Sequence, residues 1–184
     1  MIRVLVPFTK GVEEVEFVAV VDILRRADIE VCMASLDGET VTGRSGISIL
    51  PDAALSDVMH NDWEMVVLPG GMPNAHLLRD DANVKAVVDR LRLERKTIAA
   101  ICAAPTALAA YGVTADRRVT SYPACREEME VLQPSCVYVD DAVVEDDFLI
   151  TSRGAGTAVE FSLRLIARLC GEQKVVEIRQ SIVA

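Results

Sequence analysis

The chain has 184 residues, of which 51% are hydrophobic and 4% aromatic, and its 28 acidic and 19 basic side chains give a formal charge of −9. This length favours one domain over residues 1–184, and the aliphatic content is sufficient for a large Val, Ile, Leu and Ala core. An acidic surface is repelled by phosphate backbones and by anionic lipid, so we do not expect a dedicated nucleic-acid-binding or membrane-binding protein.

The sequence shows no targeting signal, and together with its cysteine usage this favours a cytoplasmic protein. No apolar run reaches the roughly 18 residues that span a bilayer, and the N-terminal segment MIRVLVPFTKG has neither the charged leader nor the cleavage site of a secretory signal. The five cysteines are odd in number and show no disulfide framework. His60 and His76 do not combine with them at zinc spacing, so we expect no metal site.

The first third of the chain alternates short apolar runs with an amphipathic one. Residues 2–8, IRVLVPF, are typical of a buried strand. Residues 12–27 predict a helix, because acids open its first turn and arginines close its last, as the helix dipole favours. A second strand is predicted at 29–36, and turn residues within 37–53 indicate an antiparallel excursion.

The middle of the chain repeats this alternation. A third core strand is predicted within 63–74, which ends in a Gly-Gly loop. An amphipathic helix follows at 83–95, and another core strand at 96–102. Residues 104–112 predict a helix with glycine at its C-terminal end.

The last third is predicted to end in helices. A short strand is expected at 118–123, and 125–134 is compatible with either a helix or a helical turn. Residues 136–154 indicate strands separated by acidic turns. A strong final helix is predicted at 157–171, and a short helix over 172–184.

Strands that alternate with helices predict an α/β fold with a mostly parallel sheet and helices on both faces. Right-handed crossovers place loops at the carboxyl ends of the strands, which is where such sheets bind ligands. Three loops are expected to meet at this edge, namely TKGVEEVE (9–16), PGGMPN (69–74) and CAAPT (102–106).

Cys102 lies where a strand turns into a helix. The free N–H groups of the following helix, with Pro105 in its first turn, would favour the thiolate and lower the thiol pKa. The alternative is a small buried hydrophobic residue, as most free cysteines are. The pattern alone leaves both possibilities open.

Two further features of this edge are candidates. Gly70 and Gly71 would let backbone approach a ligand and offer amide donors, or would form a simple tight turn. Glu13, Glu14 and Glu16 open the first helix, where two of them are expected in a solvated turn. Glu16 is the deepest in the sequence and is expected to point inward, where burial would keep it protonated beside a thiolate.

The remaining thiols and imidazoles are weaker candidates. Cys32 lies inside a strand and Cys170 inside the last apolar helix, so burial is expected for both. Cys125 and Cys136 flank a surface-like stretch and are possible secondary redox sites if they are exposed. His76 is the only histidine near enough to the Gly-Gly loop to reach Cys102.

Four motifs, in this order, resemble the ThiJ/PfpI superfamily: KGVEEVE, VVLPGG, IAAICAAPTAL and ITSRGAGTAVEF. More narrowly, the chain is similar to the branch that contains the Parkinsonism-associated deglycase of animals and its bacterial relative YajL. The resemblance runs from the first strand to the last helix. It implies a flavodoxin-like α/β sandwich and a homodimer with the first helix at the interface.

The resemblance also implies a set of site residues. Cys102 matches the reactive, oxidisable nucleophile of the family, and Glu16 matches the carboxylic acid that hydrogen-bonds it. Gly70 and Gly71 match the glycines beside the nucleophile. The amides of Gly71 and Ala103 would form an oxyanion pocket.

Three positions depart from the family pattern. Ala103 stands where protease-like relatives have a histidine, which argues against peptidase activity. Tyr122 replaces a histidine of the close animal relatives, and tyrosine is a poor base near neutral pH, which disfavours a His-assisted mechanism. An arginine that lines the site in relatives has no clean match, because Arg44 is one residue out of register and Ser45 takes its place.

The resemblance implies a stress-defence enzyme that acts on methylglyoxal, glyoxal or their early adducts on protein side chains, as a deglycase or glyoxalase without cofactor or metal. The Cys102 thiolate would add to the carbonyl carbon, amides would hold the oxyanion and Glu16 would shuttle the proton. The alternative is a peroxide sensor whose Cys102 sulfinate controls a redox-regulated chaperone without physiological turnover.

Overall fold

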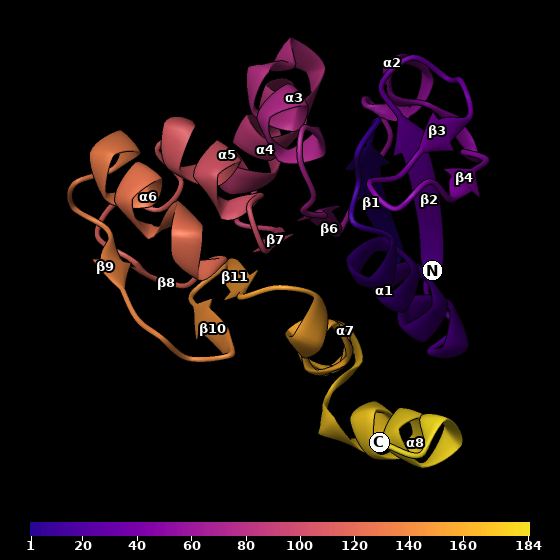
Figure 1. Ribbon diagram of the computed structural model, residues 1–184. Helices are drawn as coiled ribbons and strands as arrows, with labels where there is room; N and C mark the ends of the chain where they lie inside the picture. Colours follow the sequence, from indigo (N-terminus) through magenta and orange to yellow (C-terminus); the bar gives the residue numbers. More distant parts are fainter.

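The computed structural model describes residues 1–184 and is built around a seven-stranded sheet (Figure 1). The order of strands in the sheet is β10-β11-β7-β6-β1-β2-β5. The strands are β1 (Arg3–Phe8), β2 (Glu30–Ser35), β5 (Ala53–Ala54), β6 (Met65–Leu68), β7 (Thr97–Ile101), β10 (Val143–Asp146) and β11 (Leu149–Ser152). All neighbours pair in parallel except β10 and β11. The predicted mostly parallel α/β sheet is confirmed.

The central strands are buried on both faces, which is why they are continuous apolar runs rather than alternating ones. In β1, Val4, Val6 and Phe8 belong to one hydrophobic core, and Leu5 belongs to the other. Side chains of successive strand residues point to opposite faces, so one strand supplies both cores.

Helices cover both faces of the sheet, as predicted (Figure 1). The first core is closed by α1 (Glu14–Arg26), α7 (Ala158–Cys170) and α8 (Glu172–Ile182). The second is closed by α2 (Leu55–Val58), α3 (Asn74–Asp80), α4 (Ala82–Leu93), α5 (Pro105–Ala110) and α6 (Arg126–Leu132). None of these helices has the length and apolar character to cross a membrane.

Short elements lie outside the main sheet. The antiparallel excursion predicted at 37–53 is confirmed as a hairpin of β3 (Val41–Thr42) and β4 (Ser48–Ile49). A separate parallel pair is formed by β8 (Arg118–Val119) and β9 (Val137–Tyr138). The ambiguous segment 125–134 is helical, because a 3₁₀ turn, η1 (Pro123–Cys125), leads directly into α6.

The third core strand is shorter than the sequence predicted. It ends at Leu68, and the chain starts the unpredicted helix α3 at Asn74. Pro69 and the two following glycines interrupt the strand, since proline lacks the N–H that a central strand needs. The seven-residue helix α3 is too short for its apolar periodicity to be recognised, and no side chain caps its N-terminus.

The functional edge of the sheet is where the adjacent parallel strands β11, β7, β6 and β1 end. Their carboxyl ends lead into loops that therefore lie side by side. The sequence predicted the loops after β1, β6 and β7 at this edge. The loop after β11, which contains the 3₁₀ turn η2 (Ala155–Thr157), joins them.

Candidate active site

Cys102 occupies a strained corner directly after β7. Its φ angle of 63° lies in the left-handed region that residues other than glycine rarely adopt. Neighbouring strands and loops hold it there, because its N–H donates to the Ser152 carbonyl at 3.0 Å and its carbonyl accepts from the Tyr122 N–H at 2.7 Å. One carbonyl partner and one N–H partner thus hold Cys102 in an unfavourable backbone conformation. Residues held in such conformations are common at functional sites.

Glu16 lies beside this thiol, on the first turn of α1. The prediction that it points inward is confirmed, since its exposed fraction is 0%. Oε2 accepts a hydrogen bond from the Gly70 N–H at 3.0 Å. The carboxyl also interacts with the Cys102 thiol closely enough to shift the pKa of both groups. Oε1 has no other polar partner, so the contact with the thiol is the interaction available to it.

The other two acids of this turn play different parts. Glu13 caps the helix, because its Oε2 accepts from the Glu16 N–H at 2.8 Å. Glu14 is buried at 5% exposure, and its Oε1 accepts from the backbone N–H groups of Ser45 at 2.8 Å and Ile47 at 3.3 Å. The expectation of a solvated turn is therefore wrong for Glu14. The β3–β4 hairpin folds over it, which no pattern within the helix could reveal.

The two glycines allow backbone to pack directly against the thiol and the acid. A Cβ added to Gly70 would lie 2.5 Å from both the Cys102 Cβ and the Glu16 Oε2. Gly71 has φ +89°, and its Cβ would meet the Gly11 carbonyl at 2.3 Å. The backbone amides of Gly71 and of Ala103 both act to lower the Cys102 pKa, as expected of the two amides that were predicted to hold an oxyanion.

Burial dominates the electrostatics of the pair. The pKa of Cys102 is raised to about 12, first by burial and then by the charge of Glu16, although the amides of Gly71 and Ala103 act in the opposite direction. Burial also raises the pKa of Glu16 to about 7, against hydrogen bonds from Cys102 and Gly70. The predicted lowering of the Cys102 pKa is therefore wrong, because loss of hydration and a neighbouring acid outweigh two amide donors.

These two shifts describe one coupled pair. Near pH 7 the pair loses its first proton, and the second proton stays with the pair, mainly on the sulfur, which has the higher pKa. The thiolate is present when that proton resides on Glu16, which can then donate it in a hydrogen bond. The reactive sulfur thus depends on a neutral carboxyl beside it.

Gly154 completes the site and was not among the predicted site residues. A Cβ at this position would lie 3.8 Å from the Cys102 Sγ and 3.8 Å from the Glu16 Oε1. Its backbone therefore passes directly beside the thiol and the acid. A glycine two residues after the end of β11, at a predicted carboxyl edge, was the signal in the sequence that could have identified it.

Two of the three positions that depart from the family pattern, Tyr122 and the Arg44–Ser45 position, lie away from the thiol. Tyr122 is half-exposed, and its ring lies beside Gly154 rather than on the sulfur. Arg44 projects from the β3–β4 hairpin, whose backbone is tied to the segment before α1 by the Arg44 N–H donating to the Val12 carbonyl at 2.9 Å. Its positive charge opposes the rise in the Glu16 pKa. Arg44 therefore acts on the site within the same chain.

The other four thiols and His76 are not part of the Cys102–Glu16 pair. All five cysteines are free and half-buried, so the full burial expected for Cys32 and Cys170 is wrong, and Cys125 and Cys136 are only partly exposed. Burial raises the pKa of each of these four thiols. His76 contacts a carboxylate of α6 instead of the thiol, with its Nε2 at 3.3 Å from Glu128.

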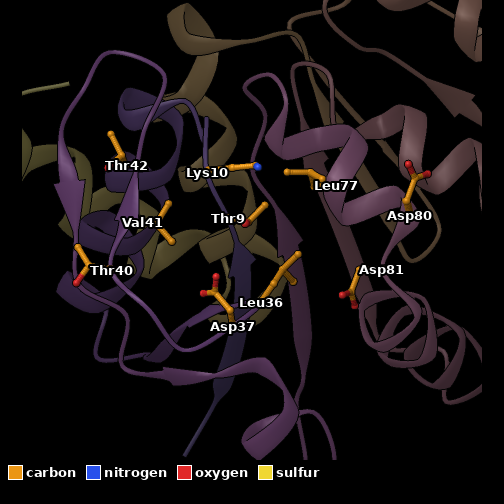
Figure 2. Close-up of a pocket in the computed structure, with 10 residues that line it drawn as sticks. All are labelled: Thr9, Lys10, Leu36, Asp37, Thr40, Val41, Thr42, Leu77, Asp80 and Asp81. Atoms are coloured by element: carbon orange, nitrogen blue, oxygen red, sulfur yellow. The ribbon is translucent and has the colours of Figure 1, made fainter.

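A separate hollow of about 540 Å³ opens at the same sheet edge, between α3 and the β3 segment (Figure 2). Lys10 extends into it toward Leu77, and Thr9, Asp37 and Asp81 also line it. No cysteine or histidine borders this hollow. The Cys102 corner therefore remains the candidate active site.

Comparison with known proteins agrees with the motifs. The model of the DJ-1/PfpI family matches residues 2–168. Protein dj-1beta of Drosophila melanogaster is 41% identical over 180 residues, which cover 97% of this chain and 95% of that protein. Its crystal structure superposes with a TM-score of 0.95 at 39% identity, over 100% of this chain and 98% of that one.

Two other relatives extend over most of the chain. The Parkinson disease protein 7 homolog of Danio rerio is 37% identical and covers 98% of this chain and 96% of that protein. A Caenorhabditis elegans protein named glutathione-independent glyoxalase DJR-1.2 is 36% identical over 165 residues, which cover 88% of this chain and 85% of that protein. The resemblance inferred from the four motifs is confirmed, and this chain belongs to the DJ-1/PfpI family.

Proposed function

We propose that this protein is a cysteine-dependent enzyme of stress defence that converts reactive dicarbonyls, such as methylglyoxal and glyoxal, or their early adducts on protein side chains. The observation that carries the proposal is the contact between a strained, amide-flanked Cys102 and a buried Glu16 whose pKa is raised to about 7. An acid poised near neutral pH can both give and take a proton. The relative named as a glyoxalase supports this substrate class.

The first step is addition of sulfur to the aldehyde carbon. The Cys102 electron pair forms the C–S bond, and the carbonyl π electrons move to oxygen. The amides of Gly71 and Ala103 stabilise that oxyanion. Glu16 gives its proton to the oxygen, which leaves a neutral hemithioacetal and a carboxylate.

The second step moves a proton between carbons. The Glu16 carboxylate removes the hydrogen of the former aldehyde carbon, and the electrons form a C=C bond and leave the oxygen of the adjacent carbonyl as an enediolate. Glu16 then returns this proton to the adjacent carbon, and the hydroxyl proton passes from the first oxygen to the enediolate oxygen, which yields a thioester of the 2-hydroxy acid. Water hydrolyses the thioester, releases the hydroxy acid and regenerates the thiol. The sum is dicarbonyl plus water to hydroxy acid, so neither cofactor nor metal is required.

We further propose a cytoplasmic homodimer that pairs through α1. Val15 and Val18 on this helix are exposed at 57% and 52%, and Val159 nearby is exposed at 42%. Exposed apolar side chains on neighbouring helices favour burial against a partner. The five cysteines are free thiols, which fits a reducing compartment.

A second candidate function is redox sensing. Among the five thiols, Cys102 is the one flanked by the Gly71 and Ala103 amides and by a protonatable acid. Two equivalents of peroxide would convert its thiolate to a sulfinate and two waters, and these donors would stabilise the new oxygens. In this reading Cys102 controls a chaperone surface without turnover.

Lactate formation from methylglyoxal tests the proposal. We expect activity in the wild type and in the control Cys170→Ser, and loss of at least about a hundredfold in Cys102→Ser and in Glu16→Gln. Absence of lactate from the folded wild type would refute the enzyme. Peroxide oxidation of Cys102, followed by mass spectrometry, would then test the sensor directly.

A further inference from the structure

A hollow of about 580 Å³ opens on the outer side of Gly154. It is bordered by Tyr122 and Arg153, and by Asp140, Ala142 and Thr157 from the surrounding loops. Gly154 separates this hollow from the thiol, since its own missing Cβ would lie 3.8 Å from the Cys102 Sγ. Because Gly154 borders both the hollow and the thiol, a substrate seated in the hollow could direct a carbonyl past Gly154 toward the sulfur.

Arg153 supplies the positive charge of this hollow. Most arginines of this acidic chain pair with a carboxylate, but Arg153 forms no ion pair. Its Nη1 donates only to the backbone carbonyl of Asp140, at 3.0 Å. The Asp140 carboxylate lies instead 3.9 Å from Arg126. A half-buried guanidinium thus keeps most of its five N–H donors free.

We infer that this hollow is a subsite for a carboxylate on the substrate, held by Arg153 while the aldehyde carbonyl at the other end of the substrate adds to Cys102. A carboxylate accepts two parallel hydrogen bonds from a guanidinium, a geometry that an uncharged group does not match. The inference deepens the proposed function, on which it rests. It names the preferred substrates as α-oxoaldehydes that carry an acidic tail, rather than methylglyoxal itself.

The negative charge of the rest of the chain makes the positively charged hollow the preferred place for an anion. The chain carries a formal charge of −9, and this long-range field repels anions from most of its surface. An unpaired arginine at the entrance offsets that repulsion locally. Half-exposed Tyr122 borders the same hollow and adds a phenol as a second possible donor.

A matched pair of substrates tests the inference. The acidic compound is 4,5-dioxopentanoate, whose product is 2-hydroxyglutarate, and the neutral one is 2-oxopentanal, in which a methyl group replaces the carboxylate. We expect wild-type kcat/KM to favour the acidic compound by about tenfold or more, as a charge-assisted hydrogen bond allows. Arg153→Gln should abolish this preference, and Arg153→Lys should retain part of it.

The control is Arg118→Gln, which removes an exposed arginine paired with Asp141 outside this hollow. It should keep the wild-type preference. Equal kcat/KM values for the two substrates in the wild type, or a preference that survives in Arg153→Gln, would overturn the subsite while leaving the dicarbonyl activity in place.

Alkylation gives a readout that does not require turnover. Iodoacetate and iodoacetamide differ by one charge, and their rates of reaction with Cys102 are followed by mass spectrometry of the peptide. We expect the iodoacetate-to-iodoacetamide ratio to fall several-fold in Arg153→Gln and to stay unchanged in Arg118→Gln. If the wild type converts no dicarbonyl at all, the proposed function fails. An unchanged ratio in Arg153→Gln would then also refute the anion subsite.

Discussion

At the scale of single residues, the site depends on one proton held between Cys102 and Glu16. Burial raises the pKa of both groups, to about 12 for the thiol and about 7 for the acid. The thiolate exists when the shared proton lies on oxygen. A substitution that neutralises or removes Glu16 therefore also changes the fraction of Cys102 that is a thiolate.

The first prediction concerns the pH dependence of this pair. Below pH 7 both groups are protonated, and the first proton leaves as the pH rises through about 7. Alkylation of Cys102 by iodoacetamide should therefore accelerate through this range in the wild type. In Glu16→Gln the step near pH 7 should disappear, because the amide does not titrate. A step that persists unchanged in Glu16→Gln would show that another group controls the sulfur.

The second prediction concerns stability. The pKa of Glu16 is raised from its usual 4.5 to about 7 in the folded protein, so the folded state binds this proton more tightly than the unfolded chain. The associated stability is fully present below pH 4.5 and is lost as the pH rises through 7. Relative to Glu16→Gln, the wild type should lose about 3 kcal/mol of unfolding free energy across this window. Urea denaturation of both proteins at the two ends of this pH window measures the difference in unfolding free energy. If the unfolding free energies of the two proteins changed with pH in parallel, the prediction would be wrong.

At the scale of elements, a buried acid at the start of α1 helps to anchor the β3–β4 hairpin. Glu14 accepts the N–H groups of Ser45 and Ile47, and a Cβ on Gly43 would lie within 2.3 Å of its Oε1. Burial favours a higher pKa for Glu14, but these backbone donors outweigh it and leave the pKa below its usual value. The hairpin that carries Arg44 is thus positioned by α1.

The third prediction removes this anchor. Glu14→Ala leaves two backbone N–H groups without their partner, which costs about 1–3 kcal/mol of stability. Hydrogen exchange at Ser45 and Ile47 should accelerate more than exchange in the central strands. Glu39→Ala, an exposed residue near the same hairpin, serves as the control and should change neither quantity. Unaltered exchange at Ser45 in the folded Glu14→Ala variant would exclude this anchoring role.

At the scale of the whole molecule, the arrangement of helices leaves one apolar face of α1 uncovered. An apolar hollow of about 420 Å³, bordered by Val18 and Val159 and by the C-terminal residues, lies against this face. Other exposed apolar side chains, such as Val131 at 74%, lie on α6 at the opposite side of the sheet. The α1 face is therefore the one suited to a second copy.

The fourth prediction tests that assembly. Light scattering of the wild type should give twice the chain mass of 20.0 kDa. Val18→Asp should yield the monomer, because a charge in an apolar interface loses its hydration without a partner. Val131→Asp places the same charge on α6 and should remain dimeric. A monomeric wild type would refute the dimer, and a dimeric Val18→Asp would show that the interface does not include this face of α1.

The sequence alone determined the order of strands and helices, the mostly parallel sheet and the position of Cys102 at its carboxyl edge. These features depend on local information, namely apolar runs, helix-end charges and turn residues. The inward position of Glu16 also followed from helical spacing. Short elements such as α3 and α2 were missed, because seven or four residues carry too little periodicity to distinguish them from a loop.

Only the tertiary structure decided the chemistry of the site. The burial of Glu14 depends on a hairpin that folds over it, and the role of Gly154 depends on β11 lying beside β7. The pKa of Cys102 rises although the sequence around it favours a thiolate. Hydration and Coulomb interactions sum over every atom near a group, and those neighbours come from segments far apart in the chain.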